Sequence, residues 1–77
     1  MEFTVRFTWY EEDRVWLATS STANYALTLD HNSFDALLER VKIAIYDIAE
    51  TDLHHKGTVT LKLEIDHTVH LDIENAA

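Results

Sequence analysis

Five histidines are the residues of this 77-residue chain best suited to chemistry, because imidazole binds metals and titrates near neutral pH. His54 and His55 are adjacent, so their side chains diverge in either a helix or a strand. His67 and His70 are three residues apart, and in a strand that spacing places them on opposite faces. An aspartate precedes both His31 and His67, but neither pair has a third ligand in register. The spacing therefore predicts no metal site and favours solvent-exposed histidines.

Serines and paired carboxylates are the other candidates for catalysis. A serine needs a neighbouring base to become a nucleophile, and Ser33 stands where a serine instead caps a helix. Glu11 and Glu12 are paired in a short polar turn, where water screens them. Gly57 is the only glycine, so a phosphate loop, a dinucleotide-binding pattern and a nucleophile elbow are all excluded. We expect a protein that is not an enzyme and uses no cofactor.

Composition limits the location and the partners. The chain has no cysteine, which excludes disulfides and zinc-cysteine sites and predicts a cytoplasmic protein. Residues 1–6 do not begin a secretory signal, and no apolar run approaches the roughly 20 residues that cross a bilayer, so no membrane association is expected. Fourteen acidic and six scattered basic residues give a net charge of -8. Direct nucleic-acid binding is therefore not expected, and the acidic surface serves either solubility or a basic partner.

Three runs of alternating polarity predict strands in the first part of the chain. Residues 3–9 alternate, and the polar turn 11–14 separates them from the β-branched and aromatic run 15–19. Two such runs joined by a short polar link predict an antiparallel hairpin. After a turn in which Asn24 suits a positive φ angle, residues 25–29 alternate again. We expect a three-stranded antiparallel meander whose first strand has an apolar face formed by Phe3, Val5, Phe7 and Trp9.

The period then changes to that of an amphipathic helix. Ser33 is the expected N-cap, and the helix is expected to end near Glu50. Apolar residues recur every three or four positions and form one stripe that can cover the sheet. That stripe consists of Phe34, Leu37, Leu38, Val41, Ile45 and Ile48.

The alternating pattern returns after the helix. Residues 59–65 predict a fourth strand, and residues 69–73 continue the same alternation. Either the strand continues, or it turns near residue 66 and forms a short hairpin. We favour the hairpin, because a straight strand of this length would overhang a small sheet. The predicted fold is α+β, in the order β-β-β-α-β with one or two strands after the helix, in a single domain over residues 1–77.

One helix covers one face of a sheet, which leaves two apolar features unexplained. Trp16 and its neighbour Leu17 point to opposite faces of the second strand, so either orientation exposes an apolar residue. An exposed Trp16 would lie along threonine methyl groups or anchor an interface. The apolar end strand offers unpaired backbone groups, which a hairpin or another chain would satisfy. We predict a homodimer or higher oligomer and a protein interface that includes Trp16, Ala18, Val69, Leu71 and Ile73.

Two runs of sequence add a family resemblance. The strand Val15-Trp16-Leu17-Ala18-Thr19-Ser20 and the helix start Phe34-Asp35-Ala36-Leu37-Leu38-Glu39-Arg40-Val41 follow an aromatic first strand and an acidic turn. This pattern, over residues 3–50, resembles the short single-domain members of the HicB-like antitoxin family, whose function is uncharacterised. The resemblance implies a HicB-like domain similar to a partial ribonuclease H fold that lacks the catalytic carboxylates.

The resemblance also implies a partner. HicB-like antitoxins bind and block a small basic HicA-like toxin, an mRNA-cleaving ribonuclease with a histidine active site. The contact residues are not a fixed motif, so none are carried over to this sequence, and neither is the DNA-binding domain of longer members. The first hypothesis is therefore an antitoxin-type protein-binding domain. The alternative is a stand-alone homodimeric module with a structural or ligand-binding role, and affinity for a HicA-like protein separates the two.

Overall fold

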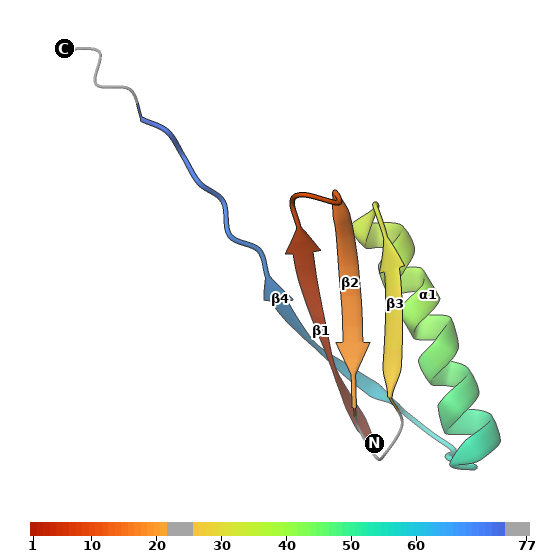
Figure 1. Cartoon of the computed structure of the whole chain (residues 1–77). Coiled ribbons are helices and arrows are strands. Elements are labelled where there is room, and N and C mark those ends of the chain that lie inside the picture. The colour runs from red at the N-terminus through yellow and green to blue at the C-terminus, as the bar shows by residue number, and fades with distance from the viewer. Residues whose placement is uncertain (22–25, 74–77) are drawn as a thin grey trace.

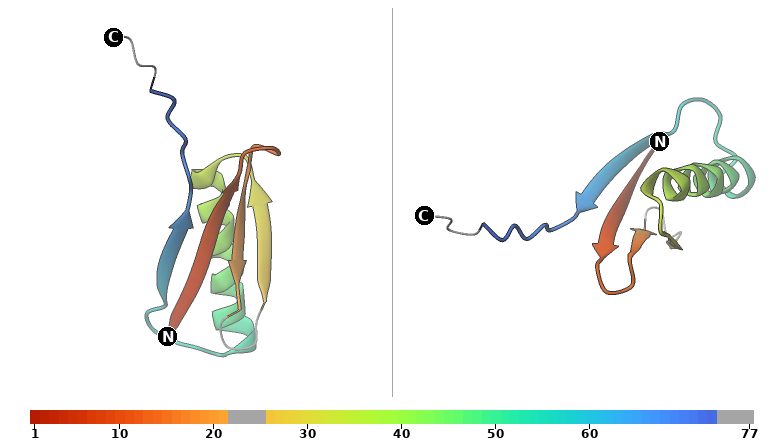
Figure 2. Two further views of the ribbon diagram at one scale, coloured as in Figure 1. Left: turned by 60° about the vertical axis from the view of Figure 1, so that its left-hand side comes forward. Right: turned by 90° about the horizontal axis from the view of Figure 1, so that it is seen from above.

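The computed structural model describes residues 1–21 and 26–73. Within these residues, four strands form one sheet and one α-helix covers one of its faces (Figures 1 and 2). The predicted α+β fold and the order β-β-β-α-β are confirmed. The predicted turn at Asn24 and the start of the third run at Tyr25 lie outside the described residues. In chain order the elements are β1 (Glu2–Tyr10), β2 (Val15–Ser20), β3 (Leu27–His31), α1 (Phe34–Asp47), the π-helical turn η2 (Ile48–Asp52) and β4 (Thr60–Asp66).

The sheet is mixed and has the strand order β3-β2-β1-β4. The predicted meander is present, because β1 pairs antiparallel with β2 and β2 pairs antiparallel with β3. Strand β4 instead runs parallel to β1, with Phe3 opposite Leu61 and Phe7 opposite Ile65. Parallel pairing needs a long crossover, and α1 supplies it by carrying the chain from one edge of the sheet to the other. The edge strands are therefore β3 and β4.

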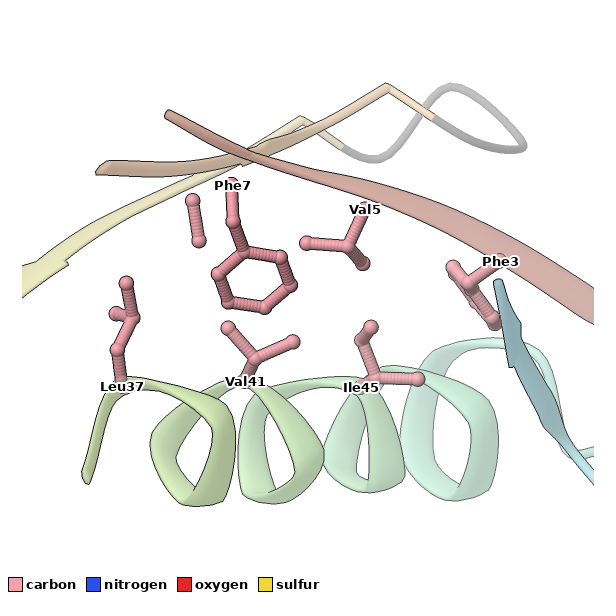
Figure 3. Close-up of a cluster of buried hydrophobic side chains, with 7 residues drawn as sticks. Phe3, Val5, Phe7, Leu37, Val41 and Ile45 are labelled. Carbon is pink, nitrogen blue, oxygen red and sulfur yellow. The ribbon is translucent and has the colours of Figure 1, made fainter. Parts of the chain in front are cut away.

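The core lies between β1, β2 and the apolar stripe of α1 (Figure 3). The alternating apolar side chains of β1 pack there against the apolar side chains that recur every three or four residues on α1, as the sequence predicts. Ala18 on β2 has no exposed surface and pairs with the buried Phe7. Trp16 and Ala18 therefore lie on the helix side of the sheet, and Leu17 lies on the other side. The buried cluster consists of Phe3, Val5, Phe7, Ala18, Leu37, Val41 and Ile45.

Local contacts explain where α1 begins and ends. The hydroxyl of Ser33 accepts a hydrogen bond from the backbone N–H of Ala36 at 3.3 Å, which confirms the predicted N-cap. The regular helix ends at Asp47, before the expected Glu50, because the chain widens there into η2. Gly57, with a φ angle of +104°, then leads the chain towards β4. No helix in the described ranges has the length and apolar character needed to span a membrane.

The end of the described chain differs from both alternatives considered for it. Strand β4 ends at Asp66, and residues 67–73, here called the arm, neither extend that strand nor fold back as a hairpin. The favoured hairpin is therefore wrong. A physical reason is that residues 66 and 67 include no glycine or asparagine, the residues that tight hairpin turns use. The arm projects from the body (Figures 1 and 2). The radius of gyration is 16.1 Å, whereas a compact chain of this length has about 11.5 Å.

Candidate functional site

Strand direction brings several element ends together at one end of the sheet. Strands β1, β3 and β4 run the same way and β2 runs the opposite way, so the last residues of three strands lie beside the start of β2. Helix α1 begins there too, because it follows β3 directly (Figure 1). Exposed carboxylates collect at this end, and we call it the acidic end. It carries Glu11, Glu12, Asp13, Asp30, Asp35 and Asp66.

Aromatic rings from three elements and the arm form a cluster at the acidic end. The ring centroids of Trp9 and Trp16 are 5.4 Å apart, and Phe34 lies 5.2 Å from Trp16. His67 of the arm lies 5.1 Å from Trp16 and 5.7 Å from Trp9. The indole N–H of Trp9 donates to a carboxylate oxygen of Glu11 at 2.6 Å. Both tryptophans are only half-buried, so part of their surface remains available to a partner.

A groove of about 580 Å³ opens beside this cluster, between the β1–β2 turn and the start of the arm. Its lining includes Trp9, Glu11, Asp66, His67 and Val69. Aromatic faces attract cations, and carboxylates accept charge-assisted hydrogen bonds from them. The groove is therefore suited to a lysine or arginine side chain.

An ion pair joins β1 to the edge strand β4 in this region. A guanidinium nitrogen of Arg6 on β1 lies 3.0 Å from a carboxylate oxygen of Asp66 on β4. The hydrogen bond to Asp66, followed by its charge, raises the pKa of Arg6. Because both side chains are about half exposed, the pair orients the end of β4 more than it stabilises the fold.

The structure separates the five residues of the predicted interface. Trp16 belongs to the half-buried aromatic cluster. Ala18 lies in the core, so it cannot contact a partner and we remove it from the interface. Val69, Leu71 and Ile73 lie on the arm and are 64%, 78% and 87% exposed. The aromatic cluster and the arm are therefore two distinct surfaces, which meet at the start of the arm.

A further apolar surface lies on β4. Leu63 and Ile65 face the same side of the sheet as the core, but they are 39% and 59% exposed. The backbone of α1 lies nearest to β2 and β3, and β4 is left largely uncovered. A groove of about 610 Å³ runs between α1 and β4, with Tyr46 and Leu61 in its lining. A hydrogen bond to Glu50 raises the pKa of Tyr46 beside this groove.

The histidines and Ser33 make local contacts. The Nδ1 atom of His31 accepts a hydrogen bond from the backbone N–H of Ser33 at 2.8 Å. The Nε2 atom of His55 lies 3.1 Å from the carbonyl oxygen of Thr58. Within the described ranges, no group of three or more histidines and carboxylates could hold a metal ion.

Sequence reasoning missed two members of the aromatic cluster. The alternating pattern places Trp9 on the core face of β1 and predicts an exposed His67; both positions are confirmed, but the ring contacts between the two residues are not predicted. A signal was present, because Trp9 directly precedes the acidic turn that starts at Glu11. The contact of His67 with both tryptophans depends on β4 lying beside β1, which the alternating pattern does not specify.

Comparison with known proteins identifies a family. A family model described as a domain of unknown function (DUF1902) matches residues 2–73, which include all the described helices and strands. No curated protein and no solved structure matches the chain. The family description states no activity or partner, so the HicB-like resemblance stays a prediction.

Proposed function

The chain belongs to the DUF1902 family of domains of unknown function, and we propose that it is a non-catalytic protein-binding domain of the antitoxin type. Its proposed partner is a small basic HicA-like toxin that cleaves mRNA in the cytoplasm. The observation that supports this most is the acidic end, where the half-buried Trp9 and Trp16 lie among six carboxylates.

The acidic end has the two properties that a site for a basic protein needs. Tryptophan is enriched among the few residues that dominate binding energy, and the pair formed by Trp9 and Trp16 presents a rigid apolar surface. The surrounding carboxylates steer a positively charged partner and speed association. A lysine or arginine of the partner can then lie against an indole ring while it pairs with a carboxylate such as Glu11.

A non-catalytic role agrees with how the candidate catalytic groups are used. The Ser33 hydroxyl accepts the capping hydrogen bond of α1, and the nearby His31 ring contacts the backbone of Ser33. The carboxylates of the acidic end are exposed, so water screens them. Such groups attract a cation well, but they are poorly suited to acid–base catalysis.

Binding to a purified HicA-like toxin, with its active-site histidine replaced, tests the proposal. We expect the double variant Glu12→Lys/Asp13→Lys to bind about tenfold more weakly than the wild type, since it removes two attractive charges and adds two repulsive ones. Affinity should also fall as salt is added. With an active toxin, the wild-type domain should protect mRNA from cleavage.

The double variant Asp47→Lys/Asp52→Lys is the matched control. Each substitution changes the charge by +2, so both double variants carry -8 + 4 = -4. The control changes lie at the far end of α1, away from the aromatic cluster. Affinity within about twofold of wild type is expected for this control, because long-range fields are screened. Equal losses in the two variants would show that net charge acts without a local site, and absence of binding would contradict the toxin partner.

A second candidate is a homodimeric module with a structural or ligand-binding role. It is favoured by the exposed apolar surface of β4 and by the groove between α1 and β4. A stable dimer that has no affinity for any HicA-like protein would support this candidate over the first.

A further inference from the structure

We propose that two copies of this chain form a dimer by exchanging their arms. Residues 67–73 of each copy pair antiparallel with the outer edge of β4 in the other copy, about a two-fold axis that passes through His67. This inference uses different observations from the proposed toxin binding, because it rests on the outer edge of β4 and the apolar residues of the arm rather than on Trp9, Trp16 and the acidic turn; the two surfaces meet at Asp66 and His67.

The two surfaces that would pair are both open. In the described part of the chain, β4 is an edge strand with β1 on one side and no strand on the other. Its outer backbone groups therefore favour the addition of another strand. The arm begins at His67 against the two tryptophans, and its end projects from the body, with Leu71 and Ile73 largely exposed. An extended apolar segment beside an unpaired edge is the arrangement from which exchanged dimers form.

The side-chain pattern requires an axis through a residue position. Residues opposite one another in a pair of strands point to the same face. An axis between two residues would place odd positions opposite even ones, and apolar side chains would then face polar ones. An axis at 67 places apolar side chains opposite each other throughout. The resulting pairs are Leu61 with Ile73, Leu63 with Leu71, and Ile65 with Val69, and symmetry repeats each pair.

The charged residues favour a two-fold axis at residue 67 over an axis at residue 66 or 68. With the axis at 67, Lys62 of one copy lies opposite Asp72 of the other, and Glu64 lies opposite His70. An axis at residue 66 would place Asp66 of one copy opposite Asp66 of the other. An axis at residue 68 would place Glu64 of one copy opposite Asp72 of the other. Like charges directly opposite are destabilising, whereas opposite charges stabilise the pair. The proposed register alone avoids both carboxylate clashes.

The exchange also accounts for the uncovered side of β4. The partner's arm becomes a fifth strand next to β4, and its Val69, Leu71 and Ile73 extend the apolar surface formed by Leu63 and Ile65. A two-fold axis perpendicular to the sheet leaves both helices on the same face. Side chains that are isolated in one copy then have apolar neighbours across the pair.

The mass of the full chain in solution tests the exchange. We expect the wild type to sediment at twice its 8.9 kDa chain mass. The variant Leu71→Asp should weaken the dimer about 100-fold, because symmetry introduces the charge twice. The matched control Ile43→Asp places the same change on exposed α1, outside the proposed pairing, and should leave the dimer intact. A monomeric wild type, or equal weakening by both variants, would overturn the proposal.

A charge exchange tests the register. Lys62→Asp places an aspartate opposite Asp72, and Asp72→Lys places a lysine opposite Lys62, so each variant should weaken the dimer about tenfold. The double variant Lys62→Asp/Asp72→Lys restores opposite charges and should dimerise within about threefold of wild type. Circular dichroism verifies that each variant is folded. Additive losses in the double variant would overturn the axis at His67.

Discussion

The arm-exchanged dimer makes one prediction that depends on distance alone. In antiparallel pairing about a two-fold axis, only the residue on the axis lies directly opposite its own copy. The chain has no cysteine, so one introduced thiol can report this contact without interference. We expect His67→Cys to form a disulfide between two copies. His67 is exposed, so its replacement leaves the core unchanged.

The expected separations distinguish the axis position clearly. Directly opposite Cα atoms are about 4.5–5.5 Å apart, and a disulfide spans Cα atoms up to about 7 Å apart. A cysteine at Ile65 would lie opposite Val69 of the other copy, so the two thiol positions would be four residues apart along the strands. At about 3.3 Å per residue, that offset is about 13 Å and excludes a bond. An equal mixture of Ile65→Cys and Val69→Cys should instead form a mixed disulfide.

Oxidised glutathione and non-reducing gel electrophoresis provide the assay. His67→Cys should convert mostly to the covalent dimer, whereas Ile65→Cys alone should stay monomeric on the gel. Ile43→Cys on the exposed side of α1 is the control for random collision. Cross-linking of residue 43 as fast as residue 67 would refute the reasoning, and so would efficient cross-linking of Ile65→Cys by itself.

Three further predictions concern the fold and the acidic end. Leu37→Ala should lower the free energy of unfolding by about 3 kcal/mol, because Leu37 has no exposed surface. The exposed control Ile43→Ala should change it by less than about 0.5 kcal/mol. Urea denaturation at one fixed protein concentration measures both values. Ser33→Ala should cost about 1 kcal/mol in the same assay, because the cap on α1 is lost. Trp9→Ala should weaken toxin binding about 30-fold in calorimetry, because a half-buried aromatic anchor is removed, and an unchanged affinity would argue against the acidic end as the binding site.

Much of the fold could be predicted because it depends on residues close in sequence. The alternation from Phe3 to Phe7 requires only a period of two, and the stripe from Leu37 to Ile45 requires only the helical period. The cap at Ser33 depends on residues three apart. Each of these patterns is complete within one element, so the sequence determines it without knowledge of the other elements.

The errors concern contacts between distant elements. Leu63 and Ile65 alternate like core residues, but whether they are covered depends on where α1 crosses the sheet, and it crosses nearer β2 and β3. The hairpin proposed for the chain end failed for a similar reason. Alternation shows that a segment can form a strand, but it does not identify the strand's partner. For the arm, the partner that the apolar and charged positions fit is β4 of a second copy.

In the candidate site too, the features that are local in sequence could be predicted, and the contacts between distant elements could not. The acidic turn at Glu11 and the neighbouring Trp9 were visible in the sequence, but the other carboxylates of the acidic end come from three distant segments. Asp66 reaches this end because β4 runs parallel to β1, and Asp30 and Asp35 reach it because β2 pairs antiparallel with both β1 and β3. The sequence predicted Trp16 as an anchor beside Ala18, and the structure instead places Ala18 in the core.

The two proposals together determine the composition of a complex. In the exchanged dimer, the partner's β4 lies on the side of the arm that faces away from β1, because β1 and β4 are neighbours in the sheet. Trp9, Trp16 and the acidic turn of each copy, on the β1 side, therefore remain open, and the dimer should bind two toxin molecules. Sedimentation of the mixture should give two domains with two toxins, while monomeric Leu71→Asp should bind one toxin with the wild-type affinity per site. Loss of toxin binding by Leu71→Asp, with binding retained by Glu12→Lys/Asp13→Lys, would instead place the toxin on the arm.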